Sequence, residues 1–318
     1  MSDLDVAPQE LRAPAVRPAA GVRVWPGRDV PLGGVRGLEV TRLLPQRGLP
    51  TVGPWCFLDL MGPTDRPADI LPHPHTGLQT VTWPLSGQIR HRDTLGSDVV
   101  VRPGELDIMT AGHGIAHSEM SVPTTAPTHL AQLWIALPDG VRDGARRFEQ
   151  HRELPHLAVD GVDVTVVVGA LAGVRSPAWV AGPVVGADLR WPATGRTVEL
   201  PVDPTHEHAV VPLSGPVEVD GVPVPGGSLG HLPTGTSRLR LTAGPGARVL
   251  LLGGPPFRED LVMWWNFVAR SHDEVVAARA EWEAGSERFG HIPAHGALRI
   301  PAPPLPGVRL RPRRRDLP

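Results

Sequence analysis

The chain contains no lysine and no tyrosine, and Asn266 is its only asparagine. With 31 basic residues against 33 acidic ones, the formal net charge is -2. This balance gives no reason to expect a strongly charged partner. Direct nucleic-acid binding is not expected either, because the sequence shows no recognition-helix pattern, no zinc-finger spacing and no strong basic excess outside its last residues.

Cysteine is almost absent as well: Cys56 stands alone, so no intrachain disulfide can form. Its neighbours Trp55 and Phe57 favour a packed, unreactive thiol, and a chain without disulfides suits a reducing compartment. No apolar run approaches the roughly 18 to 20 residues needed to cross a bilayer, and the acidic, proline-rich start does not resemble a secretory signal. We therefore expect a cytoplasmic protein without a membrane partner.

Glycine (36 residues) and proline (38 residues) interrupt the chain every few positions, and the runs between them are short and rich in β-branched residues. This pattern predicts a mostly β chain of the sandwich or barrel type. One late helix is expected, because Ser271 and Glu274 form a capping-box pattern ahead of a helical stretch that ends near Gly285 or Gly290. We also expect a short helical turn within residues 141–151.

A short motif recurs in the two halves of the chain. "WPLSG" at 83–87 nearly returns as "VPLSG" at 211–215, and a Pro-Gly turn follows each copy. Two copies of one β fold are therefore predicted. Residues 1–20 and the Pro/Arg-rich tail at 291–318 are expected to be poorly ordered, with the terminal arginines in solvent.

Two pairs of potential metal ligands stand out in the first half. His73 and His75 are two residues apart, as are His117 and Glu119. On a strand, residues at this spacing point to the same face, so two neighbouring strands would bring three imidazoles and one carboxylate to one point. That set suits a divalent transition metal with positions left open for water or substrate. The alternative is that these are surface histidines or hydrogen-bonded core histidines.

Longer motifs carry a family resemblance. The segments "VGPWCFLDLMGP", "HPHTGLQTVTWPLSG", "TAGHGIAHSE" and "MWWNFV" resemble the pirin family, and the likeness runs from about Val22 to about Gly290. The resemblance implies an all-β bicupin, with two jelly-roll barrels and a mononuclear iron in the N-terminal one. It also implies that the two histidines of HPH and the histidine and glutamate of HSE are the ligands, which are His73, His75, His117 and Glu119 here.

On this basis the chain divides into a first cupin domain with the metal at 21–140, a second without metal at 141–256, and a helical segment at 257–290. Alignment of the two PLSG motifs places Pro201 and Asp203 where the first half has the HPH histidines. The second barrel is therefore expected to keep the fold and lose the metal.

Several other polar residues have assignments that the structure can test. Gln79 shares the parity of His73 and His75, so it is expected to face the metal, at a position where many relatives carry glutamate. If that glutamate is the base in active relatives, Gln79 would leave this protein slow or inactive, because an amide does not accept the proton; the alternative is that Gln79 only orients a water or ligand. Thr76 is expected to point outward. His113 is expected to be a turn residue, with a place at the entrance or behind a ligand as the alternative.

Four further residues are assigned no chemistry at the metal. Asp107 and His91 are expected at turns or solvent faces. His206 and His208 are expected in a solvated turn, with a secondary site as the alternative.

The spacing of the ligands does not choose between Fe(II), Mn, Ni, Co, Cu and Zn, whereas the resemblance favours iron. Some pirins are quercetin 2,3-dioxygenases, so the resemblance implies a dioxygenase acting on a flavonol-like substrate and dioxygen. Glu119 would then also be the base that removes the flavonol 3-hydroxyl proton. The resemblance equally allows a metal- or redox-sensing regulator that acts through a protein partner. A metal-free structural bicupin is disfavoured by the four retained ligands.

Overall fold

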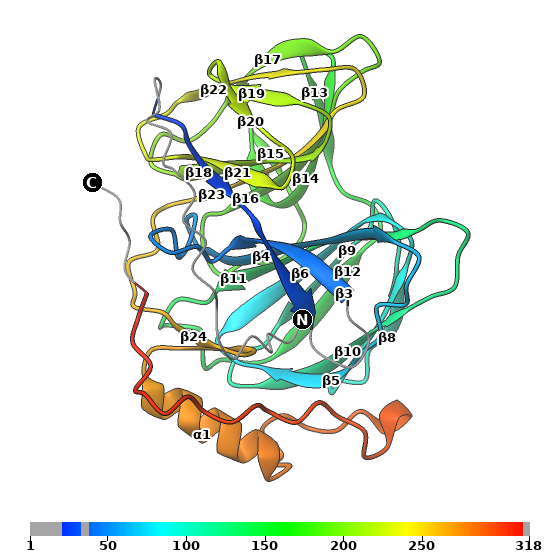
Figure 1. Cartoon of the computed structure of the whole chain (residues 1–318), viewed down its shortest axis with the longest axis vertical. Coiled ribbons are helices and arrows are strands. Elements are labelled where there is room, and N and C mark those ends of the chain that lie inside the picture. Colours follow the sequence, from blue (N-terminus) through cyan, green and yellow to red (C-terminus); the bar gives the residue numbers. More distant parts are fainter. Residues whose placement is uncertain (1–20, 33–37, 314–318) are drawn as a thin grey trace.

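The computed structural model describes residues 21–32 and 38–313, which form two stacked β barrels. In Figure 1 the barrel from the first half of the chain lies below the barrel from the second half, and the α-helix lies on the outer side of the lower barrel. The prediction of an all-β chain with two barrels and a helix near the C-terminus is confirmed. No helix in these ranges is long and apolar enough to cross a membrane.

The first barrel consists of two antiparallel sheets. Among the described residues the larger sheet has the order β12-β9-β6-β11-β4-β3-β2 and the smaller one has the order β5-β10-β7-β8. The strands of the larger sheet are β2 (Arg28–Leu32), β3 (Leu38–Leu44), β4 (Trp55–Thr64), β6 (Leu78–Ser86), β9 (Leu106–Thr110), β11 (Thr128–Ala136) and β12 (Arg147–His151). Those of the smaller sheet are β5 (Ile70–His75), β7 (Ile89–Asp93), β8 (Asp98–Val101) and β10 (Ile115–Ser121). Apolar side chains such as Met61, Leu78 and Trp134 fill the interior.

The second barrel repeats this arrangement. Its larger sheet has the order β1-β21-β18-β23-β16-β14-β13, with β15 beside β14, and its smaller sheet has the order β17-β22-β19-β20. The larger sheet contains β1 (Arg23–Pro26), β13 (His156–Val159), β14 (Val162–Leu171), β15 (Val174–Arg175), β16 (Val185–Arg190), β18 (Glu207–Ser214), β21 (Ser228–Leu232) and β23 (Arg248–Gly254). The smaller sheet contains β17 (Arg196–Pro201), β19 (Val217–Val219), β20 (Val222–Val224) and β22 (Arg238–Ala243). The two PLSG motifs end the equivalent strands β6 and β18, as the repeat predicted.

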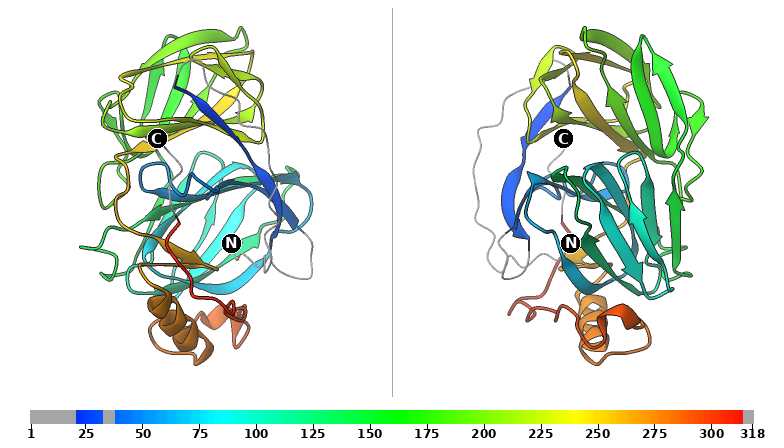
Figure 2. Two further views of the ribbon diagram at one scale, coloured as in Figure 1. Left: turned by 60° about the vertical axis from the view of Figure 1, so that its left-hand side comes forward. Right: turned by 90° about the vertical axis from the view of Figure 1, so that its right-hand side faces the viewer.

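The N-terminal strand β1 belongs to the second barrel, whereas β12 belongs to the first barrel although it lies beyond the expected domain boundary at residue 141. Strand β1 pairs with β21 of the second barrel, and β12 pairs with β9 of the first. Figure 2 shows the blue N-terminal strands running from the upper barrel to the lower one. The expected helical turn at 141–151 is therefore wrong, because only turns precede β12 there and residues 147–151 extend an existing sheet.

The two larger sheets pack against each other through an apolar layer. Leu58, Val81 and Trp83 of the first barrel meet Val168 and Leu250 of the second in one buried cluster. Strand β6 is buried on both faces over nearly its whole length, because one face lines the first barrel and the other meets the second barrel. This burial agrees with the absence of charged residues from its sequence.

The C-terminal segment closes the outer side of the first barrel. A hairpin of β24 (Val262–Trp264) and β25 (Phe267–Ala269) precedes helix α1 (His272–Glu283), and the short 3-10 helix η1 (Pro293–His295) follows. The predicted helix is confirmed, with the Ser271 hydroxyl accepting a hydrogen bond from the Glu274 amide at 3.2 Å. The Glu274 carboxylate accepts from the backbone amide of Arg270, so it does not complete a capping box.

The described part of the tail, residues 291–313, packs on the protein, contrary to the expected disorder. The Ile300 amide donates to the carbonyl of Pro72, and the Trp282 indole donates to the carbonyl of Ile300 at 2.9 Å. The tail therefore lies between α1 and the strand that carries the HPH motif. Residues 1–20 and 314–318, for which disorder was also expected, lie outside the described residues.

Candidate metal centre

Three imidazoles meet inside the first barrel. His73 and His75 lie on β5 and His117 lies on β10, directly opposite His73 in the antiparallel pairing. All three side chains are fully buried, and one nitrogen of each lies within 4.8 Å of the others. The Nε2 atoms of His75 and His117 are 3.1 Å apart. The structure thus brings together three of the four predicted ligands.

Backbone carbonyls hold two of these rings. His73 Nδ1 lies 3.0 Å from the carbonyl oxygen of Leu71, and His75 Nδ1 lies 3.1 Å from that of Asn266. A carbonyl oxygen only accepts, so each Nδ1 carries the proton and each Nε2 keeps its lone pair. His73 Nε2 is buried and has no hydrogen-bond partner among the described residues. The two rings are therefore arranged to donate Nε2 lone pairs.

The third ring is held by another histidine. His117 Nδ1 lies 3.3 Å from His91 Nδ1, and His91 Nε2 lies 3.1 Å from Asp93 Oδ2. His91 is 3% exposed and stacks on Phe148, so the expected place at a turn or solvent face is wrong. The missed signal was the spacing of His91 and Asp93, which are two residues apart on a strand and so share a face.

Burial keeps the three clustered histidines neutral. Removal from water lowers the pKa of His73, His75 and His117 well below the ordinary value, and the neighbouring imidazoles lower the pKa of His75 and His117 further. Neutral imidazole is the form that binds a transition metal, so protons do not compete for these nitrogens near neutral pH. The donor set therefore fits a divalent transition metal.

Glu119 lies beside the cluster but outside the group of three. The pairing of β10 with β5 shifts between His117 and Glu119, because Glu119 is opposite Ile70. Its carboxylate is buried, Oε1 accepts a hydrogen bond from the Thr82 hydroxyl at 3.3 Å, and Oε2 has no partner among the described residues. A buried carboxylate oxygen without a donor is a free ligand or base, so Glu119 as the fourth ligand stays a prediction.

Asp107 is also inside the barrel, which corrects its expected place at a turn or solvent face. It lies opposite Thr82 in the pairing of β6 with β9, is 2% exposed, and accepts a hydrogen bond from Gln150 at 3.0 Å. Burial raises the pKa of this carboxyl to about 6. No alternation of polar and apolar residues predicts this position, because the strand "LDIMT" is buried on both faces.

We expect Asp107→Asn to raise the free energy of unfolding of the metal-free protein at pH 7. The raised pKa means that stability is lost as the pH rises through about 6, since the folded state then carries a buried charge. The gain should reach up to about 3 kcal/mol at pH 7 and shrink towards pH 5, as measured by urea unfolding. The exposed control Asp163→Asn should have little effect at either pH, and an equal gain from Asp107→Asn at both pH values would contradict the raised pKa.

Gln79 does not face the metal cluster, contrary to expectation. Its amide donates to the Thr110 hydroxyl at 2.9 Å and to the carbonyl of Trp179 in the second barrel at 3.1 Å. Val81, which has the same parity on β6, lies in the layer between the barrels. The odd-numbered residues of β5 and β6 do not share one face, because the chain turns at Gly77 between the two strands. Gln79 therefore belongs to the contact between the barrels.

Thr76 is buried, although it was expected to point outward. It forms a parallel bridge with Phe267, and its carbonyl accepts a hydrogen bond from the Val268 amide at 3.2 Å. The hairpin β24–β25 therefore covers the end of β5. Trp265, at the tip of the hairpin, has a φ of 53°, which is unfavourable for a bulky residue. The next residue is Asn266, whose carbonyl accepts the hydrogen bond from His75.

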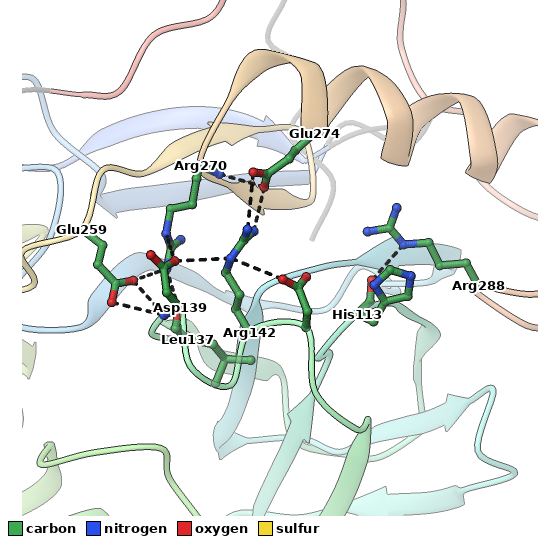
Figure 3. A network of polar contacts seen from close by, with 9 residues as sticks. His113, Leu137, Asp139, Arg142, Glu259, Arg270, Glu274 and Arg288 are labelled. Atoms are coloured by element: carbon green, nitrogen blue, oxygen red, sulfur yellow. Dashed lines mark hydrogen bonds and ion pairs between the residues drawn. The ribbon is translucent and has the colours of Figure 1, made fainter.

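A polar network fixes this C-terminal segment to the first barrel (Figure 3). Arg270 donates to Asp139 at 2.8 Å and to the carbonyl of Leu137 at 2.7 Å, and Arg142 donates to Glu274 at 2.7 Å. These contacts join the loop after β11 to Arg270, which follows the hairpin, and to the first turn of α1, and so support the hairpin that holds His75.

His113 is an exposed turn residue, as expected. Its carbonyl accepts a hydrogen bond from the Arg288 guanidinium at 2.9 Å, and Figure 3 shows the contact. Its imidazole is not among the described three-histidine cluster.

His206 and His208 are buried, so their expected place in a solvated turn is wrong. They are 8% and 1% exposed, and with Asp203 they line a cavity of about 540 Å³ in the second barrel. Burial lowers the pKa of both, that of His208 to about 4. Within residues 21–32 and 38–313, these side chains do not form a three-ligand group like that of the first barrel.

Comparison with known proteins gives matches over both barrels. The model of the pirin family matches residues 37–135, and the model of the pirin C-terminal cupin domain matches residues 187–290. A Pseudomonas aeruginosa protein named "putative quercetin 2,3-dioxygenase" is 46% identical over 283 residues, which cover 88% of this chain and 89% of that protein. A pirin-like protein of Caulobacter vibrioides is 34% identical, over 83% of this chain and 94% of that protein.

A solved structure agrees with these matches. The crystal structure of quercetin 2,3-dioxygenase from Acinetobacter baumannii has a TM-score of 0.86 and 40% sequence identity, and the match covers 91% of this chain and 97% of that one. Since the two family models fall on the two barrels and the Pseudomonas relative matches most of the sequence, this chain belongs to the pirin family and contains its two cupin domains.

Proposed function

We propose that this chain is a mononuclear Fe(II) dioxygenase of the quercetin 2,3-dioxygenase type, with His73, His75, His117 and Glu119 as the metal ligands. One observation carries the proposal: the Nδ1–H groups of His73 and His75 donate hydrogen bonds to backbone carbonyls, so their bare Nε2 atoms face the third imidazole in a buried interior. Lone pairs gathered without donors favour a cation between them. The names of the relatives support the reaction.

Three imidazoles and a carboxylate accept several divalent ions, and Mn, Ni, Co, Cu and Zn remain the alternatives to iron. When bound, the ion would supply a Lewis-acid and redox centre for the reaction of a flavonol with dioxygen.

Cys56 is fully buried, and burial raises the pKa of its thiol to about 12, which confirms the predicted packed thiol. We place the protein in the cytoplasm, where a reducing environment would keep iron ferrous.

Glu119 would be the residue of this chain that acts as the base in the reaction. Its unpaired Oε2 would take the proton of the flavonol 3-hydroxyl group, while the Thr82 hydroxyl holds Oε1 in place. Thr82 also contacts the Gln132 side chain at 3.1 Å, so the carboxylate belongs to a buried polar group on β6, β10 and β11. A buried setting strengthens the attraction between this carboxylate and an acidic substrate proton.

Iron-loaded wild type mixed with quercetin in air should consume the flavonol, seen as loss of its absorbance, and release carbon monoxide. Glu119→Gln keeps the shape of the side chain but accepts no proton, and should be slower by about 10² to 10⁴. Metal-free wild type is the control. Bound iron without turnover would contradict the dioxygenase proposal and favour a metal-sensing regulator with a protein partner.

A further inference from the structure

His117 differs from the other two histidines in what holds its Nδ1 atom. The partners of His73 and His75 are carbonyl oxygens, which only accept hydrogen bonds. The partner of His117 is the Nδ1 atom of His91 at 3.3 Å, and an imidazole nitrogen either donates or accepts. Another group must therefore decide the direction of this bond.

Asp93 sets the direction of this hydrogen bond through its contact with the other nitrogen of His91. Its Oδ2 lies 3.1 Å from His91 Nε2, while its Oδ1 accepts from the amides of Leu95 at 2.8 Å and Ser97 at 3.1 Å. The carboxylate is thus fixed by the turn between β7 and β8. It accepts from His91 Nε2, which puts the proton of a neutral His91 on Nε2 and leaves Nδ1 as an acceptor.

This acceptor at His91 determines which ring nitrogen of His117 carries the proton. With His91 Nδ1 as the acceptor, His117 carries its proton on Nδ1, and its Nε2 lone pair faces the lone pair of His75 Nε2 at 3.1 Å, where a bound cation would satisfy both acceptors. In the opposite arrangement, His117 Nε2 would carry the proton and be unable to bind a metal. Neutral His91 would then turn a bare Nε2 towards the Asp93 carboxylate, and two acceptors would face each other in a buried site.

The ring of His91 is also fixed in its plane. It stacks on Phe148 with ring centres 4.4 Å apart and planes at 15°. Phe148 lies on β12, the edge strand that pairs with β9 in the larger sheet of the first barrel. A stacked ring held by a carboxylate has little freedom to turn its nitrogens away from His117.

We propose that His91, directed by Asp93 and held flat by Phe148, is the positioning residue that selects the metal-binding tautomer of His117. The inference rests on the proposed metal at the three-histidine cluster. Contacts behind a metal ligand of this kind typically change metal affinity by about 10- to 100-fold.

The test compares wild type with His91→Leu, which keeps the volume but removes the acceptor, and with His91→Gln, which restores an acceptor oxygen. Cobalt(II) is the probe, with affinity measured by chelator competition and ligand geometry by its visible spectrum. We expect about 10- to 100-fold weaker binding and an altered spectrum for His91→Leu, and a return towards wild type for His91→Gln. Circular dichroism of each metal-free variant reports on folding.

The result that overturns the proposal is wild-type affinity and spectrum in His91→Leu, or equal losses in both variants, which would show a packing role alone. Failure of wild type itself to bind cobalt would instead contradict the metal centre. Nitrogen-15 NMR of the metal-free wild type needs no variant and reads the tautomers before any metal fixes them. It should find the proton of His117 on Nδ1 and that of His91 on Nε2, and any other assignment overturns the proposal.

Discussion

Replacement of His117 by alanine should weaken binding of iron or cobalt by more than about 100-fold, or about 2.7 kcal/mol, while both barrels stay folded. His117 is the only member of the described three-histidine cluster on β10, and its Nε2 lies 3.1 Å from that of His75. Loss of a direct ligand should weaken metal binding more than loss of a residue that only contacts a ligand. Metal content after anaerobic purification and chelator competition measure the effect.

The matched control is His113→Ala, four residues earlier in the same motif. Its side chain is exposed and lies outside the three-histidine cluster, so metal content should not change. Circular dichroism should show the same strand signal for both variants. If His117→Ala keeps its metal as tightly as wild type, the site assignment is wrong.

The metal-free protein should lose stability steeply as the pH falls from 7 to 5. The unfolded chain protonates its histidines near pH 6.5, whereas burial holds the pKa of His73, His75 and His117 well below that value in the fold. Their contribution is fully present above about pH 6.5 and is lost as the pH falls, because only the unfolded state takes up protons. Each histidine contributes at most about 1.4 kcal/mol per pH unit to this loss, so the three together contribute at most about 4 kcal/mol per pH unit.

Urea unfolding at a series of pH values measures this slope. Asp107, with its raised pKa, works in the opposite direction but only by one proton. Metal-free His117→Ala has one buried imidazole fewer, so its slope between pH 6 and 5 should be smaller by about 1.4 kcal/mol per pH unit. The same slope in both proteins would show that His117 titrates freely in the fold.

The local part of the site was predictable from the sequence. Two residues at spacing two on a strand share a face, and this alone predicted that His73 and His75 would point together. The repeat of PLSG predicted two barrels, and the positions of glycine and proline predicted mostly strands. These predictions succeeded because each depends on a single strand or turn.

The predictions that failed depend on how strands meet. Gln79 has the parity of His75, but the turn at Gly77 begins a new strand whose odd-numbered face meets the second barrel. His91 and Asp107 are expected from the sequence at turns or solvent faces, yet neighbouring strands bury both. The pairing of β12 with β9, which brings Phe148 to His91, leaves no periodic signal in the sequence.

The most direct test of the metal centre is a crystal of the anaerobically iron-loaded protein, with anomalous diffraction measured at the iron absorption edge. We predict one strong peak about 2.0–2.2 Å from Nε2 of His73, His75 and His117 and from a carboxylate oxygen of Glu119. A loaded crystal with no peak at the three histidines, or with its peak in the second barrel beside His206 and His208, would contradict the assignment.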